Sequence, residues 1–168
     1  LSKTEEDCER AYQQYLEIID YYKDSRIDIS IKPSQLGLKL DKSRCYEYMH
    51  SLVAQARTYG MTVRLDMEDD SLVEDTVDLC LHLKKEHPNI GVALQTNMYR
   101  TKEDLQTLMN NNISIRLVKG AYKGNNKIGT VGKSSEDTEV KISKDGEILL
   151  KGFELKRIKK RKPSIKIF

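Results

Sequence analysis

The hydrophobic pattern of residues 27–118 switches repeatedly between a period of two residues and a period of three to four residues. Short β-branched runs predict strands over residues 27–31, 62–66, 91–95 and 113–118. Apolar residues at helical spacing predict helices over residues 3–24, over residues 43–59, from residue 71 and from residue 101. Strands that alternate with helices are typical of consecutive βα units and a parallel sheet. Either a doubly wound sheet or part of a (βα)8 barrel satisfies this pattern.

Capping patterns predict where these helices begin. Each pairs a hydroxyl residue with an acidic residue three positions later: Ser2 with Glu5, Ser71 with Glu74, and Thr101 with Asp104. Gly60 is placed to end the second helix. The acidic run Glu68-Asp69-Asp70 is interpreted as a solvated loop whose charge favours the N-terminus of the following helix. Tyr12 and Tyr15 are expected to pack against other helix residues.

Composition excludes several classes of protein. No apolar run approaches the roughly 18–20 residues that a membrane span needs. The N-terminus is acidic and is not expected to be a signal peptide. Cys8, Cys45 and Cys80 are widely spaced, without a CxxC motif, so neither a disulfide framework nor a metal site is expected. These features favour a cytoplasmic protein, with a peripheral position at the membrane as an additional expectation.

The chain beyond residue 124 has a different character. Alternating runs at residues 138–142 and 147–151 flank Asp145-Gly146 and predict a β-hairpin. The last 18 residues carry a charge of +7, so the remainder carries −4 within a total of +3. This basic tail could bind an anionic membrane surface, although its lack of interleaved aromatic residues does not favour nucleic acid. A frayed, solvated terminus is the simpler interpretation.

Polar or charged residues occur at or near the end of each predicted strand of the parallel sheet. They are Lys32, Asp66, Gln95, Arg116 and Lys119. Ligands of parallel α/β sheets bind beyond the carboxyl ends of the strands, so these groups could converge on one pocket. Cationic and amide side chains suit an anionic or oxygen-rich ligand. The alternative is that polar residues simply mark where strands emerge into water.

Four stretches around these residues resemble the proline dehydrogenase family. They span residues 29–37, 63–69, 91–101 and 115–122. The resemblance implies a (βα)8 barrel that holds FAD without a covalent link. It also implies oxidation of L-proline to Δ1-pyrroline-5-carboxylate, with electrons passed to a quinone.

The resemblance also implies a role for each matching residue. Lys32 would pair with the substrate carboxylate, Asp66 would hold the active-site network, and Tyr122 would form a wall of the substrate site. Gln95 would bond the polar edge of the flavin, Arg116 would lie near the flavin N5, and Lys119 would contact the cofactor.

The resemblance covers residues 3–124 and matches only the second to fifth strands of the barrel. We therefore expect an incomplete barrel over residues 1–124 and an appended β-hairpin with a basic tail over residues 125–168. Residues 129–152 resemble a short stretch of AMP-forming acyl-CoA ligases, but the ligase's catalytic lysine and phosphate loop are absent, so ligase activity is not expected. A partial barrel is expected to expose two sheet edges and an apolar face. The chain would then self-associate, require a complementing barrel fragment, or persist as a non-catalytic remnant.

Overall fold

A computed structural model describes residues 2–120, 140–142, 148–150 and 165–167 of the chain. Four strands form one parallel sheet in the order β1-β2-β3-β4. These strands are β1 (Asp28–Ile31), β2 (Thr62–Leu65), β3 (Ile90–Gln95) and β4 (Ser114–Val118). The helices are α1 (Glu5–Tyr21), α2 (Lys42–Thr58), α3 (Val73–Lys84) and α4 (Thr101–Asn110), with 3-10 turns η1 (Pro33–Leu36) and η2 (Asp70–Leu72).

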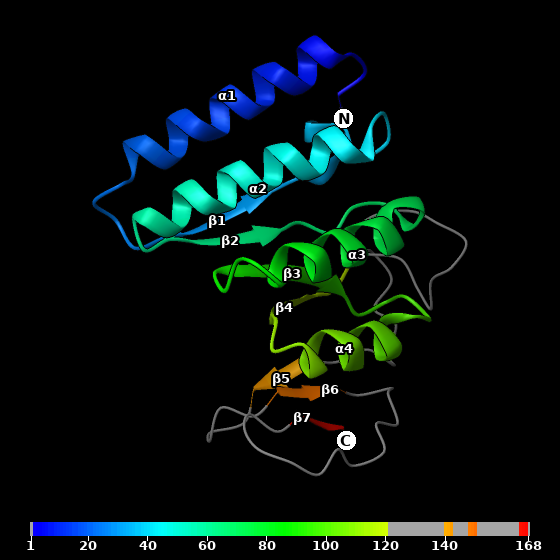
Figure 1. The fold of residues 1–168 in the computed structure, drawn as a ribbon. Helices are drawn as coiled ribbons and strands as arrows, with labels where there is room; N and C mark the ends of the chain where they lie inside the picture. Colours follow the sequence, from blue (N-terminus) through cyan, green and yellow to red (C-terminus); the bar gives the residue numbers. More distant parts are fainter. Residues whose placement is uncertain (1, 121–139, 143–147, 151–164, 168) are drawn as a thin grey trace.

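Helices α2, α3 and α4 lie on the same side of the sheet, and α1 packs beside α2 at the β1 edge (Figure 1). Because a doubly wound sheet has helices on both faces, this arrangement favours the alternative of a partial barrel. The expected α/β fold with four parallel strands and a partial (βα)8, TIM-like architecture is confirmed.

The hydrophobic core lies between the sheet and these helices. Side chains alternate between the two faces of a strand, and Ile29, Ile31, Val63 and Leu65 all point toward the helices and are buried. Their helix partners include the fully buried Leu52 of α2. The apolar residues that recur every two positions in the strands therefore pack against those that recur every three to four positions in the helices.

The opposite face of the sheet is polar, and the expectation of an uncovered apolar face is wrong. Strand register places Asp28, Ser30, Arg64, Ser114 and Arg116 on that face. Ser30, Ser114 and Arg116 are exposed. The apolar residues of these strands occupy the alternate positions, which face the helices.

Arg64 ties three strands together across this polar face. Its Nε donates to Asp28 Oδ2 of β1 at 2.8 Å, and its two terminal nitrogens donate to Ser114 of β4, each at 3.4 Å. The guanidinium reaches β4 by passing over Gly91 of β3. A Cβ at Gly91 would lie 3.1 Å from Arg64 Nη1 and 2.7 Å from the Ser114 carbonyl oxygen, so this position requires glycine.

The helix boundaries differ from the capping patterns in three places. Thr4 and Asp7, rather than Ser2 and Glu5, form the capping box of α1. The Ser2 hydroxyl instead donates to the Gln35 carbonyl oxygen at 2.7 Å. The Ser2 hydroxyl, which the local pattern predicts as the helix cap, thus makes a long-range contact instead.

The starts of α3 and α4 are also set differently from the prediction. Asp69 accepts from the Ser71 backbone N–H and hydroxyl, which makes η2 the entry to α3, and α3 has no side-chain cap. Thr101 is the first residue of α4, and its hydroxyl donates to the Gln95 carbonyl oxygen at 2.6 Å. The prediction for Gly60 is confirmed, because it follows α2 with a left-handed φ of +70°.

The three cysteines are unpaired and buried among helix and sheet residues, as the absence of a disulfide pattern predicts. Burial raises the pKa of the Cys45 thiol and that of Cys80 to about 12. Both side chains are therefore protonated thiols at neutral pH and act as small apolar core groups.

A second, smaller sheet lies in the C-terminal part of the chain. β5 (Val140–Ile142) pairs antiparallel with β6 (Ile148–Leu150), which confirms the two predicted arms of the hairpin. β7 (Ile165–Ile167) pairs parallel with β6 and was not predicted. The predicted hairpin turn, the boundary at residue 124 and most of the basic tail lie outside the described residues.

Replacing Arg64 with methionine should destabilise the fold. The substitution keeps an unbranched side chain of similar length and removes the hydrogen bonds to Asp28 and Ser114. Because the Arg64 side chain is only 11% exposed, we expect a loss of about 2 kcal/mol in the free energy of unfolding, measured by urea denaturation. Lys42→Met is the matched control, since its ion pair with Asp75 is on the outer surface. Equal destabilisation by the two substitutions would contradict a structural role for the Arg64 contacts.

His87 should make stability depend on pH. Burial lowers the pKa of His87, with neighbouring His50 and Arg57 acting in the same direction and Glu86 opposing them. Because the unfolded chain then binds a proton that the folded chain resists, stability should fall as the pH drops from about 7.5 to about 5.5. The substitution His87→Gln should reduce this slope, measured by urea denaturation across that range. Identical slopes for the two proteins would show that His87 does not contribute.

Candidate active site

Asp66 joins two cationic side chains near the carboxyl ends of the strands. It directly follows β2, and its carboxylate accepts from Lys32 Nζ, which follows β1, at 2.6 Å. Its other oxygen accepts from Arg116 Nη2 of β4, also at 2.6 Å. The parallel register brings these three residues together from separate βα units. The convergence expected from the sequence is therefore present for Lys32, Asp66 and Arg116.

This three-residue cluster is open to solvent. The side chains of Lys32 and Arg116 are 42% and 45% exposed, whereas that of Asp66 is 21% exposed. One carboxylate between two cations leaves a formal charge of +1. Arg116 donates to Asp66 through Nη2, and its guanidinium carries further N–H groups at the mouth of the partial barrel, where an anion can reach them.

Helix α1 holds the segment that carries Lys32. The Tyr15 hydroxyl donates to Gln35 Oε1 at 2.6 Å and accepts from the Lys32 backbone N–H at 3.3 Å. Burial raises the pKa of Tyr15, so the hydroxyl keeps its proton and can make both contacts. Tyr15 thus has a polar contact beyond the packing role that was predicted for it.

Gln95, at the end of β3, is buried and held from two sides. Its side-chain nitrogen Nε2 donates to the Glu68 backbone carbonyl oxygen at 2.6 Å, and its own backbone carbonyl oxygen accepts from the Thr101 hydroxyl. Its side-chain oxygen Oε1 has no hydrogen-bond partner among the described residues. A buried acceptor without a donor is costly, so this atom is a candidate contact for a bound ligand.

The loops after β3 and β4 approach each other closely beside this site. The Thr96 backbone N–H donates to the Val118 carbonyl oxygen at 2.8 Å. Gly120 has a φ of +90°, and a Cβ there would lie 2.1 Å from Asn97 Oδ1. Both the backbone conformation and the lack of space require glycine at this position.

The structure differs from the sequence expectation for Glu68, which is buried rather than part of a solvated loop. Its carboxylate accepts from the Ser34 backbone N–H at 2.9 Å and from the Ser34 hydroxyl. Sequence reasoning missed Ser34, because a single serine in a loop carries no signal of a partner more than thirty residues away.

The two other predicted site residues do not join the Asp66 cluster among the described residues. Lys119 is exposed and makes no hydrogen bond or ion pair with the described residues, and Tyr122 lies outside them.

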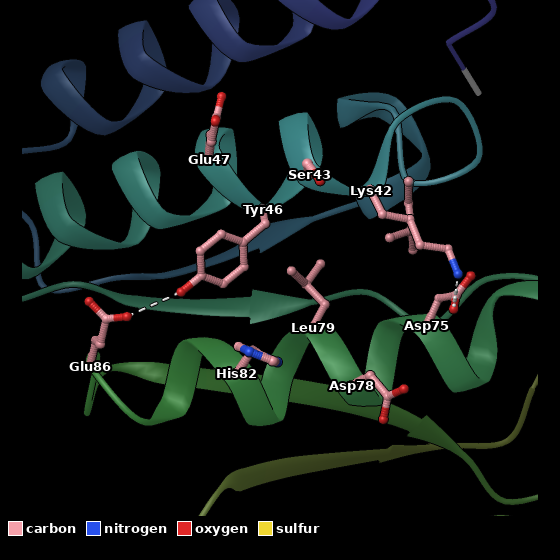
Figure 2. A pocket seen from close by; sticks show the side chains of 10 residues that line it. Lys42, Ser43, Tyr46, Glu47, Asp75, Asp78, Leu79, His82 and Glu86 are labelled. Carbon is pink, nitrogen blue, oxygen red and sulfur yellow. Dashed lines mark hydrogen bonds and ion pairs between the residues drawn. The ribbon is translucent and has the colours of Figure 1, made fainter.

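A separate groove lies on the outer surface between α2 and α3 (Figure 2). It has a volume of about 750 Å³ and is lined by apolar side chains and several acidic ones. Lys42 crosses it to reach Asp75 at 2.7 Å, and the Tyr46 hydroxyl donates to Glu86. None of its lining residues belongs to the Asp66 cluster, so the groove does not form part of the candidate site.

Metal binding and membrane insertion are two further classes of function to consider for the described residues. Within them, no three His, Cys, Asp or Glu side chains are grouped so that they could hold a metal ion. Nor does any helix in this part of the chain have the length and apolar character needed to cross a membrane.

Comparison with known proteins identifies the family. The family model for proline dehydrogenase matches residues 1–136. The chain belongs to the proline dehydrogenase family. It is 33% identical over 136 residues to proline dehydrogenase 2 of Bacillus subtilis (strain 168), which covers 81% of this chain and 44% of that protein. It is 32% identical over 118 residues to proline dehydrogenase 1 of Bacillus subtilis subsp. natto, which covers 70% of this chain and 37% of that protein.

Solved structures support the same fold. The proline utilization A (PutA) protein of Bdellovibrio bacteriovorus, inactivated by N-propargylglycine, superposes with a TM-score of 0.62 at 19% identity, covering 71% of this chain and 16% of that one. The D779W mutant of PutA from Bradyrhizobium japonicum gives a TM-score of 0.63 at 19% identity, covering 72% and 15%. The chain therefore spans less than half the length of the curated proline dehydrogenases that it matches.

The ion pairs of Asp66 should be measurable by a double-mutant cycle. We expect the coupling free energy between Asp66→Asn and Arg116→Met to be about 1 kcal/mol or less, because both side chains are partly exposed. The coupling should shrink when NaCl is raised from about 0.05 M to about 1 M, since salt screens exposed charges. Urea denaturation of the four proteins measures it. Complete additivity at low salt would show that the pair does not form in solution.

Proposed function

We propose that this chain provides the proline- and FAD-binding part of a proline dehydrogenase, which oxidises L-proline to Δ1-pyrroline-5-carboxylate. The observation that carries the proposal is the joining of Lys32 and Arg116 by Asp66 at the mouth that also holds Gln95. The family resemblance gives each of these four residues a role in the active site, together with Lys119 and Tyr122. The family match over residues 1–136 supports the same conclusion.

The residues present fit FAD in their chemistry. Gln95 Oε1 is a buried acceptor that lacks a donor among the described residues, and the isoalloxazine ring carries an imide N–H at its polar edge. The Arg116 side chain is exposed on the same face of the sheet as Gln95. It would stabilise the electron-rich reduced ring. Lys119, also exposed, would contact the cofactor from the end of β4. When bound, FAD would supply the hydride acceptor for the oxidation.

The same cluster fits the substrate. Lys32 would bind the proline carboxylate through a charge-assisted hydrogen bond, which would fix the ring carbon relative to the cofactor. Asp66 would hold Lys32 and Arg116 in place, because its two oxygens contact one cation each. Tyr122 would complete the wall of the substrate site, as the family resemblance implies.

We propose that the remaining strands come from a complementing barrel segment. β1 and β4 each pair with one neighbour within the four-stranded sheet, so each has an outer edge that a parallel strand could extend. The inner face carries Ser30, Ser114 and Arg116, which are exposed. Polar side chains of this kind suit a barrel lumen that holds a polar cofactor. We also propose a quinone as electron acceptor, as the family resemblance implies. A cytoplasmic location, peripheral to the membrane, is proposed from the composition and the cysteine spacing.

Flavin binding tests the proposal directly. We would titrate the 168-residue chain with FAD by isothermal calorimetry, alone and mixed with the part of Bacillus subtilis proline dehydrogenase 2 that this chain does not match. FAD should bind with a shifted absorbance spectrum, and proline should bleach the bound flavin in the complemented sample. Gln95→Leu, which removes the acceptor while keeping the size, should weaken FAD binding about tenfold, equivalent to one hydrogen bond of about 1.4 kcal/mol.

Two variants define how the result is interpreted. Lys32→Met should retain FAD binding and lose the bleaching by proline, because its role is toward the substrate carboxylate. Lys42→Met, in the outer groove, should change neither. If neither the chain alone nor the complemented sample binds FAD, the proposed function is wrong and only common ancestry with the family remains.

A further inference from the structure

Glu68 is a buried acidic side chain that the proposed function does not use. It is 8% exposed and lies in the loop between β2 and η2, two residues after Asp66. The other buried acidic residue among those described, Asp104, makes two hydrogen bonds with the guanidinium of Arg100. The hydrogen bonds of the Glu68 carboxylate come instead from the Ser34 backbone N–H and hydroxyl, both neutral donors. A carboxylate is costly to bury, so its contacts at this position call for an explanation.

The contacts of Glu68 connect three segments of the candidate site. Its carboxylate holds Ser34, which lies two residues after Lys32 in the segment following β1. Its backbone carbonyl oxygen accepts from Gln95 Nε2 at the end of β3. The residue itself follows Asp66 after β2. One side chain and its own carbonyl therefore fix the relative positions of Lys32, Asp66 and Gln95.

The contact with Gln95 also decides which way the amide faces. A backbone carbonyl can only accept a hydrogen bond, so the Gln95 atom next to the Glu68 oxygen must be the nitrogen. This leaves Oε1 as the atom available to a ligand. If the loop carrying Glu68 moved away, the amide could rotate and present a donor in place of an acceptor. The chemistry that Gln95 offers to a ligand thus depends on where Glu68 is held.

We propose that Glu68, anchored by Ser34, is a positioning residue that sets the side-chain orientation of Gln95 and, through it, affinity for the cofactor. The cofactor part of this inference rests on the proposed function, whereas the orientation of Gln95 does not. Glu68 touches neither cofactor nor substrate in this role. It acts through its carboxylate on the loop and through its carbonyl on the Gln95 amide.

Side-chain amide NMR of the full chain tests the orientation. In the unaltered protein, the Gln95 side-chain N–H resonances, assigned by their loss in Gln95→Leu, should exchange slowly with solvent, because Nε2 is buried and hydrogen-bonded. Glu68→Ala should raise that exchange rate about tenfold or more, since it removes the anchor. Glu68→Gln should restore much of the protection, because its amide oxygen can still accept from Ser34.

Arg64→Met is the control for general destabilisation, since Arg64 contacts Asp28 and Ser114 toward the amino ends of the strands, whereas Gln95 lies at the carboxyl end of β3. At matched global stability, adjusted with urea, it should leave the Gln95 exchange rate unchanged. If Glu68→Ala leaves the Gln95 resonances as they are, or if Arg64→Met changes them equally, the positioning role is wrong.

A second measurement follows the cofactor. By FAD titration, Glu68→Ala should weaken binding about tenfold relative to the unaltered chain, and Arg64→Met at matched stability should not. If the unaltered chain binds FAD and Glu68→Ala binds it equally well, the link to the cofactor is overturned. If the unaltered chain binds no FAD, either alone or in the complemented sample, the proposed function fails and the link to the cofactor fails with it. The NMR measurement then decides the orientation of Gln95 separately.

Discussion

Parallel pairing of β1 to β4 in a fixed register is the constraint on which the candidate site depends. It brings residues from separate βα units to one end of the sheet, and it decides which face each side chain occupies. Because side chains alternate, a slip of one residue in β4 would turn Arg116 toward the helices and away from Asp66. Packing of Ile115 and Leu117 of β4 against the hydrophobic core opposes such a slip. The apolar layer thus holds the polar site in register, although the two contain different residues.

Much of the fold could be predicted from sequence because its signals are periodic and local. The change of period between residues 27 and 118 located all four strands and the helices between them, with end points within a few residues. The helix caps were less predictable, because several hydroxyl and acidic residues lie close together at each start. Ser2 and Thr4 could both cap α1, and only the distant Gln35 carbonyl oxygen, which takes the Ser2 hydroxyl, decides between them. Information of that kind is not present in a window of ten residues.

The candidate site shows the same division. Lys32, Asp66 and Arg116 could be predicted to converge, since each stands at or near a strand end and parallel strands share a rim. Glu68 could not, because an acidic run before a helix favours a solvated loop by every local criterion. Its burial depends on Ser34, whose position is set by the turn after β1. The polar inner face was missed for a related reason: the sequence shows that Arg64 interrupts a strand, but not that Asp28 and Ser114 lie on either side of it.

The two arginine–aspartate ion pairs of the sheet differ in solvent exposure, and this difference distinguishes a structural pair from one with binding capacity. The Arg64 side chain is 11% exposed, and its Nε, Nη1 and Nη2 donate to Asp28 and Ser114, so its contacts are satisfied within the fold. The Arg116 side chain is 45% exposed and donates through Nη2 to Asp66, which also holds Lys32. A guanidinium carries five donors, so one that uses a single donor at an open mouth retains the capacity to bind an anion. An arginine–aspartate pair thus stabilises the fold toward the amino ends of the strands, and a second pair leaves binding capacity toward their carboxyl ends.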